Sequence, residues 1–149
     1  MPMPVDHRLC TFYRISASLA GVCILAFGVI GFVQTWSDPW IYFSQPVFWI
    51  STNNILNVVS VVFGVALITS AFLGGNLPSY VDTAIGTMFM LNGLFWLMWL
   101  RTPPVNVLHF TMTNVVFSFV VGTIILTCGL YGRTASSEEK IRSRRARLD

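Results

Sequence analysis

Residues 54–72 read NILNVVSVVFGVALITSAF, an apolar run without a charged side chain. A helix of about 20 such residues crosses the roughly 30 Å hydrocarbon core of a bilayer. Three further runs of similar length and character occupy residues 15–36, 81–100 and 107–131. We therefore expect an all-α membrane protein, a bundle of four transmembrane helices over these four ranges.

The composition of the whole chain agrees with a membrane domain. Of its 149 residues, 54% are hydrophobic and only 10% are charged, and the mean hydropathy is +0.69. A soluble domain carries about 25% charged residues. We expect an N-terminal segment at 1–14, a transmembrane domain at 15–132 and a basic tail at 133–149, with no separate soluble domain.

Basic residues lie at both ends of the chain. Arg8 and Arg14 precede the first run, and the segment after the last run holds Arg133, Lys140, Arg142, Arg144, Arg145 and Arg147. Because lysine and arginine mark cytoplasmic segments, both termini should be cytoplasmic and the protein multi-pass. The tail should be attracted to anionic lipid, whereas nucleic-acid binding has no further support.

The second and fourth runs resemble each other. Residues 57–64 read NVVSVVFG and residues 114–122 read NVVFSFVVG, a match that needs one inserted residue. Glycines in the first and third runs also share a seven-residue spacing. We interpret the chain as two tandem helical hairpins in a parallel repeat, with a pseudo-axis perpendicular to the bilayer. The alternative is a chance match between apolar segments of low complexity.

Small residues at these spacings fall on one helix face and let two helices approach closely in lipid. We therefore predict helix packing at eight positions. They are Gly21, Gly28, Ser60, Gly64, Gly86, Gly93, Ser118 and Gly122.

Local patterns suggest where the helices begin and end. Ser79 and Asp82 have the spacing of a capping box, with Ser79 as the N-cap of the third helix. Asn106 can cap the fourth helix. Gly74 and Gly75 can end the second helix, because glycine adopts a positive φ without strain.

The connection at 37–52 is rich in aromatic residues and holds a single charged residue, Asp38. It should lie at the headgroup layer, either as an interfacial anchor or as a docking surface for a partner subunit or a lipid-soluble ligand. The candidate interface residues are Trp40, Tyr42, Phe43, Phe48 and Trp49.

The chain offers little for catalysis or metal binding. His7 and His109 should lie on opposite sides of the membrane, and Cys10, Cys23 and Cys128 form no C-x-x-C pair. We expect no catalytic residue, no metal and no cofactor, and hence no enzyme.

Amides and hydroxyls are the main polar groups of the helices, where we expect no buried acid or base of the kind that ion transport uses. One interpretation is hydrogen bonding between helices. The alternative is a small polar pocket that opens outward beneath the aromatic connection and is lined by Asn53, Asn57, His109 and Asn114.

Two stretches resemble the starts of two helices in an actinobacterial family of small four-helix membrane proteins, known as a domain of unknown function. They are residues 48–67, FWISTNNILNVVSVVFGVAL, and residues 104–122, PVNVLHFTMTNVVFSFVVG. The resemblance spans about residues 12–132 and implies the fold and a bacterial inner (plasma) membrane. Family members often carry histidine where this chain has Asn53, Asn57 and Asn114, so the resemblance implies no histidine-based role here.

These observations leave two functional hypotheses. The first is a non-catalytic accessory or structural subunit of a larger bacterial plasma-membrane complex, respiratory or envelope-building, whose partners are other membrane subunits and lipids. The alternative is a small transporter, or a lipid-binding or quinone-binding protein, that acts as a homo-oligomer.

Overall fold

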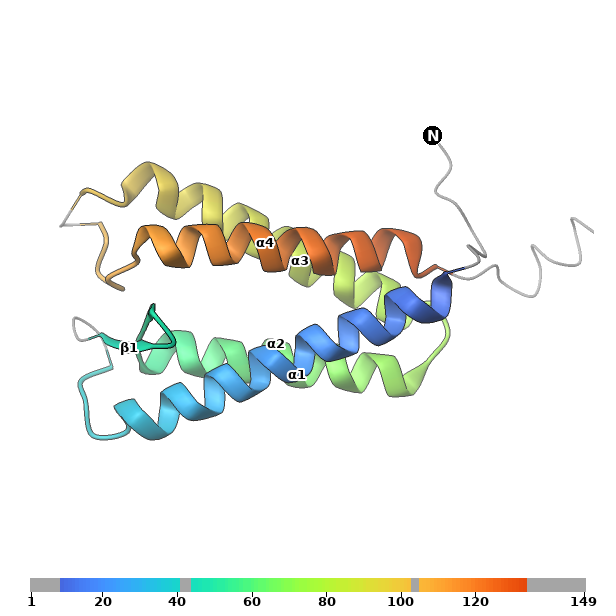
Figure 1. The fold of residues 1–149 in the computed structure, drawn as a ribbon, viewed down its shortest axis with the longest axis horizontal. Helices are drawn as coiled ribbons and strands as arrows, with labels where there is room; N and C mark the ends of the chain where they lie inside the picture. Colours follow the sequence, from blue (N-terminus) through green and yellow to red (C-terminus); the bar gives the residue numbers. More distant parts are fainter. Residues whose placement is uncertain (1–8, 41–43, 103–104, 134–149) are drawn as a thin grey trace, which may run out of the picture.

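The fold is a bundle of four helices (Figure 1). The structure is a computed structural model that describes residues 9–40, 44–102 and 105–133. Its helices are α1 (Cys10–Thr35), α2 (Asn54–Leu73), α3 (Leu77–Trp99) and α4 (Met112–Tyr131), and two short strands, β1 (Gln45–Val47) and β2 (Ile50–Thr52), precede α2. All four helices are long and apolar enough to cross a membrane, which confirms the predicted fold class.

The first helix begins earlier than predicted. α1 starts at Cys10 instead of residue 15, so Arg14 lies inside the helix. Its guanidinium donates a hydrogen bond to the carbonyl oxygen of Gly75, 3.1 Å away. A long arginine side chain can reach the end of the bundle from within a helix, so its charge is a poor marker of the boundary.

Both predicted caps need correction. α3 starts at Leu77, with Asn76 at the N-cap position, and the Ser79 hydroxyl instead donates to the carbonyl oxygen of Gly129 on α4 at 2.6 Å. The N-cap of α4 is Thr111, whose side chain accepts from the backbone N–H of Asn114, so α4 starts five residues later than the predicted 107.

Asn106 stabilises the preceding loop through two hydrogen bonds with the backbone of Phe110. The end of α2 agrees with the prediction, because Gly74 and Gly75 have φ of 72° and 62°.

The helices pack as two hairpins, α1 with α2 and α3 with α4 (Figure 1). A Cβ added to Gly64 would lie 2.8 Å from the carbonyl oxygen of Gly21, and one added to Gly122 would lie 3.2 Å from that of Gly86. These distances are close to or below van der Waals contact, so the glycines allow the backbones to touch. These glycines therefore lie at close contacts between helices.

The contacts repeat from one hairpin to the other. Gly28 packs against Val61, and Gly93, 65 residues later, packs against Phe119, which the repeat alignment pairs with Val61. The two hairpins thus share one packing arrangement. Common ancestry of the hairpins stays a prediction.

A small apolar core joins the hairpins, with one fully buried residue from each helix: Ile24, Leu67, Ile85 and Ile125. Outside it, large apolar side chains are exposed along all four helices, as expected where a bundle faces lipid.

The two ends of the bundle differ. At one end, called here the terminal end, the Cys10 thiol donates to the carbonyl oxygen of Gly132 at 3.1 Å, so the start of α1 and the end of α4 lie together. The opposite end carries β1 and β2 and the α3–α4 connection, and is called the β end (Figure 1). An even number of spans therefore places both described ends of the chain on one side.

The aromatic connection forms an antiparallel β-hairpin rather than an irregular segment. Pro46 pairs with Ser51, and Phe48 and Trp49 form the turn with φ of 46° and 67°. Two positive φ values match the type I′ geometry that suits a two-residue hairpin turn. Val47 is buried, so one face of the β-hairpin packs on the bundle.

Candidate functional site

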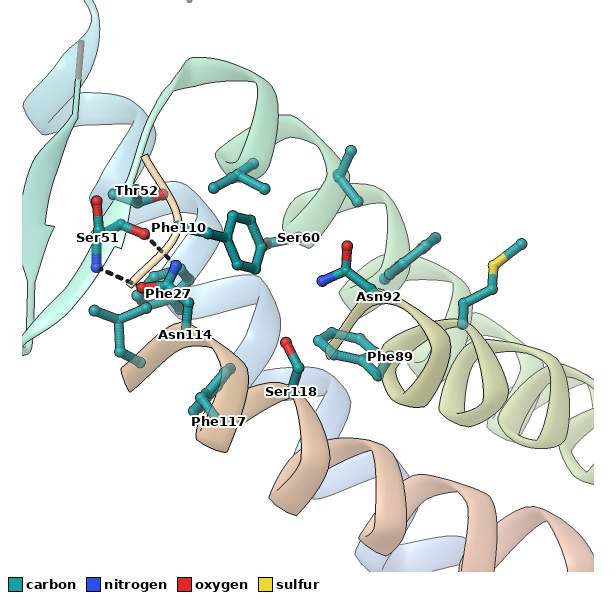
Figure 2. Close-up of a pocket in the computed structure, with 15 residues that line it drawn as sticks. Phe27, Ser51, Thr52, Ser60, Phe89, Asn92, Phe110, Asn114, Phe117 and Ser118 are labelled. Carbon is teal, nitrogen blue, oxygen red and sulfur yellow. Dashed lines mark hydrogen bonds between the residues drawn. The ribbon is translucent and has the colours of Figure 1, made fainter. Parts of the chain in front are cut away.

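A cavity of about 270 Å³ lies between the two hairpins near the β end (Figure 2). All four helices contribute to its wall, together with β2 and Phe110 from the α3–α4 connection. We call it the inter-hairpin cavity. Its size is near the lower end of the range for small-molecule sites.

Asn114 holds β2 over the β end of the cavity (Figure 2). Its amide nitrogen donates to the carbonyl oxygen of Ser51 at 2.6 Å, and its oxygen accepts from the Ser51 N–H at 3.1 Å. Ser51 pairs with Pro46, which has no N–H, so the backbone groups of Ser51 face away from β1. The Asn114 amide therefore acts like one residue of an additional strand.

Asn57 holds the equivalent position in the first hairpin but points elsewhere. Its nitrogen donates to the Thr35 hydroxyl at 3.0 Å, and its oxygen accepts from the Thr52 hydroxyl at 2.5 Å. Gly31 leaves the room for this side chain, because any Cβ there would overlap the Asn57 amide. The position that corresponds to Gly31 in the second hairpin is Trp96, which is too large to leave such room.

The predicted polar pocket therefore needs correction: of its four residues, only Asn114 lines the inter-hairpin cavity. Asn53 is the N-cap of α2 and also donates to the carbonyl oxygen of Leu108 at 3.3 Å. Asn57 is fully buried in its own hydrogen bonds, and His109 lies exposed in a loop with φ of 52°. The asparagines lie near the starts of α2 and α4 in the sequence, but this position does not show which of their amides line the same cavity.

The cavity wall is mostly apolar. Five phenylalanines contribute to it, and two of their pairs span neighbouring helices. The ring centroids of Phe63 and Phe89 are 5.9 Å apart, and those of Phe27 and Phe117 are 6.1 Å apart. These pairs leave a wall of flat apolar surface.

Three polar side chains on the helices of this wall have a hydroxyl or NH₂ group without a hydrogen bond to a described residue. The hydroxyls of Ser60 on α2 and Ser118 on α4 form no hydrogen bond with any described residue. The Asn92 oxygen accepts from the Trp96 indole N–H at 3.1 Å, and no acceptor for its NH₂ group occurs within residues 9–40, 44–102 and 105–133. The sequence assigned Ser60 and Ser118 to helix packing, and their place in the repeat was the only signal of a shared site.

The wall of the cavity between α2 and α3 reaches the bundle surface. Val59 and Met88 line it, and their side chains are 41% and 55% exposed on the bundle surface. Both residues belong to helices that are long and apolar enough to cross a membrane.

The aromatic candidates of the 37–52 connection lie apart from the cavity. Trp40, Phe48 and Trp49 are 57%, 67% and 87% exposed, and Tyr42 and Phe43 lie outside the described residues. The basic tail from residue 134 also lies outside them, so its attraction to anionic lipid stays a prediction.

A buried acid corrects the expectation that the helices contain none. Asp82 of α3 is 2% exposed, and its Oδ1 has no hydrogen-bond partner in the described part of the chain. Arg14 of α1 is the charged group that acts on it electrostatically. The capping pattern hid this acid, because it assigned Asp82 to an exposed first turn.

Comparison with known proteins gives one match. The model of the family described as "Domain of unknown function (DUF4383)" matches residues 14–131, from the second turn of α1 to the last residue of α4. No curated protein and no solved structure matches the chain.

Proposed function

The chain belongs to the DUF4383 family, and from this premise we propose that its four-helix domain binds a membrane-soluble ligand in the inter-hairpin cavity. The observation that carries the proposal is a cavity between two hairpins whose polar groups at Ser60, Asn92 and Ser118 have unused hydrogen-bonding capacity.

Such groups have a free-energy cost in a membrane domain. Ser118 is buried, whereas Ser60 and Asn92 are half-buried. The cost of a fully buried hydroxyl or amide without a partner, about 1–3 kcal/mol, is therefore an upper value for these groups. The costs are avoided when the cavity contains a molecule that hydrogen-bonds to these groups. A ligand that combines polar atoms with apolar surface satisfies the serines and contacts the phenylalanines together.

The access route favours a ligand from the bilayer over one from water. β2 and Phe110 cover the cavity at the β end, where Asn114 fixes β2 by two hydrogen bonds. The lateral opening between Val59 and Met88 leads to the apolar surface. A ligand that partitions into lipid thus reaches the cavity without passing β2 and Phe110.

A photoactivatable lipid-soluble probe tests the proposal. We expect the probe to label peptides from the cavity wall, and Val59→Trp to reduce labelling because a larger side chain narrows the opening. Thr69→Trp is the matched control, since Thr69 is an exposed residue of the same helix outside the cavity. Equal labelling of wild type and Val59→Trp would refute binding in the cavity.

The proposed setting is the plasma membrane of a bacterium, with the terminal end in the cytoplasm. The basic residues at both ends of the sequence support this orientation. In intact cells, a membrane-impermeant thiol reagent should label Trp49→Cys but not Ser136→Cys. Labelling of Ser136→Cys alone would reverse the orientation.

A second proposed function is that of a non-catalytic accessory subunit. The turn of the β-hairpin favours it, because Phe48 and Trp49 project from the end of the bundle with 67% and 87% of their surface exposed. Large exposed aromatic side chains commonly become the anchors of an interface. Purification in mild detergent tests this role, which requires a stoichiometric membrane partner.

A further inference from the structure

We propose that the ligand of the inter-hairpin cavity is a neutral molecule with a flat ring that carries carbonyl oxygens on two sides, joined to an apolar tail: the quinone class. This inference rests on the proposed function and specifies its ligand.

Each of the three polar groups on the helical walls can donate a hydrogen bond. Asn92 already uses its oxygen to accept from Trp96, so its NH₂ group is the part that remains for a ligand. Ser60 and Ser118 can each donate one hydroxyl proton. None of the residues that line the cavity is charged. The matching ligand is therefore neutral and rich in acceptor oxygens.

The donors lie on different walls. Ser60 belongs to α2 and Ser118 to α4, at corresponding positions of the two hairpins, and Asn92 belongs to α3 (Figure 2). Two carbonyl groups on opposite sides of one ring can reach donors on both hairpins. The repeat thus offers matching donors to the two ends of a para-dicarbonyl ring.

The shape of the wall selects a flat head group. The phenylalanine pairs Phe63–Phe89 and Phe27–Phe117 border the cavity with ring faces and edges, which contact aromatic or conjugated rings favourably. A volume of about 270 Å³ holds a ring system but not a long hydrocarbon chain. The tail must leave through the opening between Val59 and Met88, directly into lipid.

Binding measurements on the full-length protein in phosphatidylcholine nanodiscs test this inference. The probes are a naphthoquinone with a short prenyl tail, a naphthalene with the same tail but no oxygens, and a short-chain diacylglycerol. The naphthoquinone should bind most tightly. The double variant Ser60→Ala/Ser118→Ala should weaken its binding about tenfold, the effect of losing two hydrogen bonds, and leave naphthalene binding unchanged.

Two control variants complete the design. Ser70→Ala removes a buried hydroxyl of α2 that donates to the carbonyl oxygen of Leu67, outside the cavity, and should leave all binding unchanged. Val59→Trp should weaken every probe that enters through the opening.

The outcomes separate the ligand class from the site. If naphthalene binds as tightly as naphthoquinone and Val59→Trp weakens both, the cavity binds ligands but the quinone class is wrong. If diacylglycerol binds best and depends on the two serines, the carbonyl groups belong to ester lipids, which also overturns the class. If no probe binds, or Val59→Trp affects none, the proposed function itself fails.

Discussion

Replacing Asn114 with leucine should weaken the docking of β2 on the bundle without unfolding the domain. The change keeps a similar side-chain size but removes both hydrogen bonds to Ser51, of 2.6 and 3.1 Å. At about 0.5–1.5 kcal/mol for each bond, the docking of β2 loses about 1–3 kcal/mol. This loss corresponds to an opening equilibrium about 5 to 150 times more favourable.

Hydrogen exchange measured by mass spectrometry reads this equilibrium directly, because the exchange rate of a protected amide follows the population of its open state. Peptides that cover residues 48–53 should exchange faster by about the same factor, 5 to 150 times. Peptides from the middle of α2 should be unchanged. Buried Val47 and Thr52 keep the β-hairpin attached, so the effect should stay local.

Asn57→Leu supplies the matched comparison. Asn57 is fully buried against Gly31, and its bonds join α1 to the residue that precedes α2. Its replacement should therefore accelerate exchange across both α1 and α2. The amide of Asn114 does not hold β2 over the cavity if Asn114→Leu leaves hydrogen exchange at residues 48–53 unchanged. The same conclusion follows if its exchange pattern matches that of Asn57→Leu.

Three further changes test other parts of the structure. Gly64→Ala would place a Cβ 2.7 Å from the α1 backbone and should destabilise the domain by about 1–3 kcal/mol in detergent unfolding. Gly93→Ala should destabilise it less, because the nearest atom to the added Cβ is 3.3 Å away. Equal effects of the two variants would contradict the assigned helix contacts. Asp82→Asn should raise stability by about 1–3 kcal/mol, because it removes a buried carboxylate with an unpartnered oxygen. A loss of stability would mean that the electrostatic attraction of Arg14 outweighs this cost. Trp40→Ala with Trp49→Ala should release a partner subunit from the purified complex, since a buried interface tryptophan often contributes about 2 kcal/mol or more; an intact complex would argue against the accessory role.

The amide side chains of Asn57 and Asn114 show what the sequence motifs alone did not predict. The motifs around Asn57 and Asn114 look alike, yet one amide joins α1 to α2 and the other supports β2. The difference coincides with a difference in the neighbouring helix, which has Gly31 beside Asn57 and the larger Trp96 at the equivalent position of the second hairpin. That pairing depends on helix register, which the motif itself does not contain.

Asp82 was misassigned for a related reason. Its spacing from Ser79 suits a capping box, but α3 starts earlier, so both side chains turn toward the bundle. The N-cap is Asn76, three residues before the predicted Ser79, so Ser79 and Asp82 both lie inside the helix instead of at its exposed start. Local capping signals are therefore weak evidence beside the packing of a whole helix.

The sequence by itself determined the four spans and the glycine faces that pair the helices. In lipid every backbone group needs an internal hydrogen bond, so a long apolar run must be helical, and close helix contact requires small residues at regular spacing. Only the tertiary structure decided that the two hairpins leave a cavity between them, that β2 covers it, and that Ser60, Asn92 and Ser118 face it together. Those features depend on the relative placement of helices that are distant in sequence, and such placement is set by packing across the whole bundle.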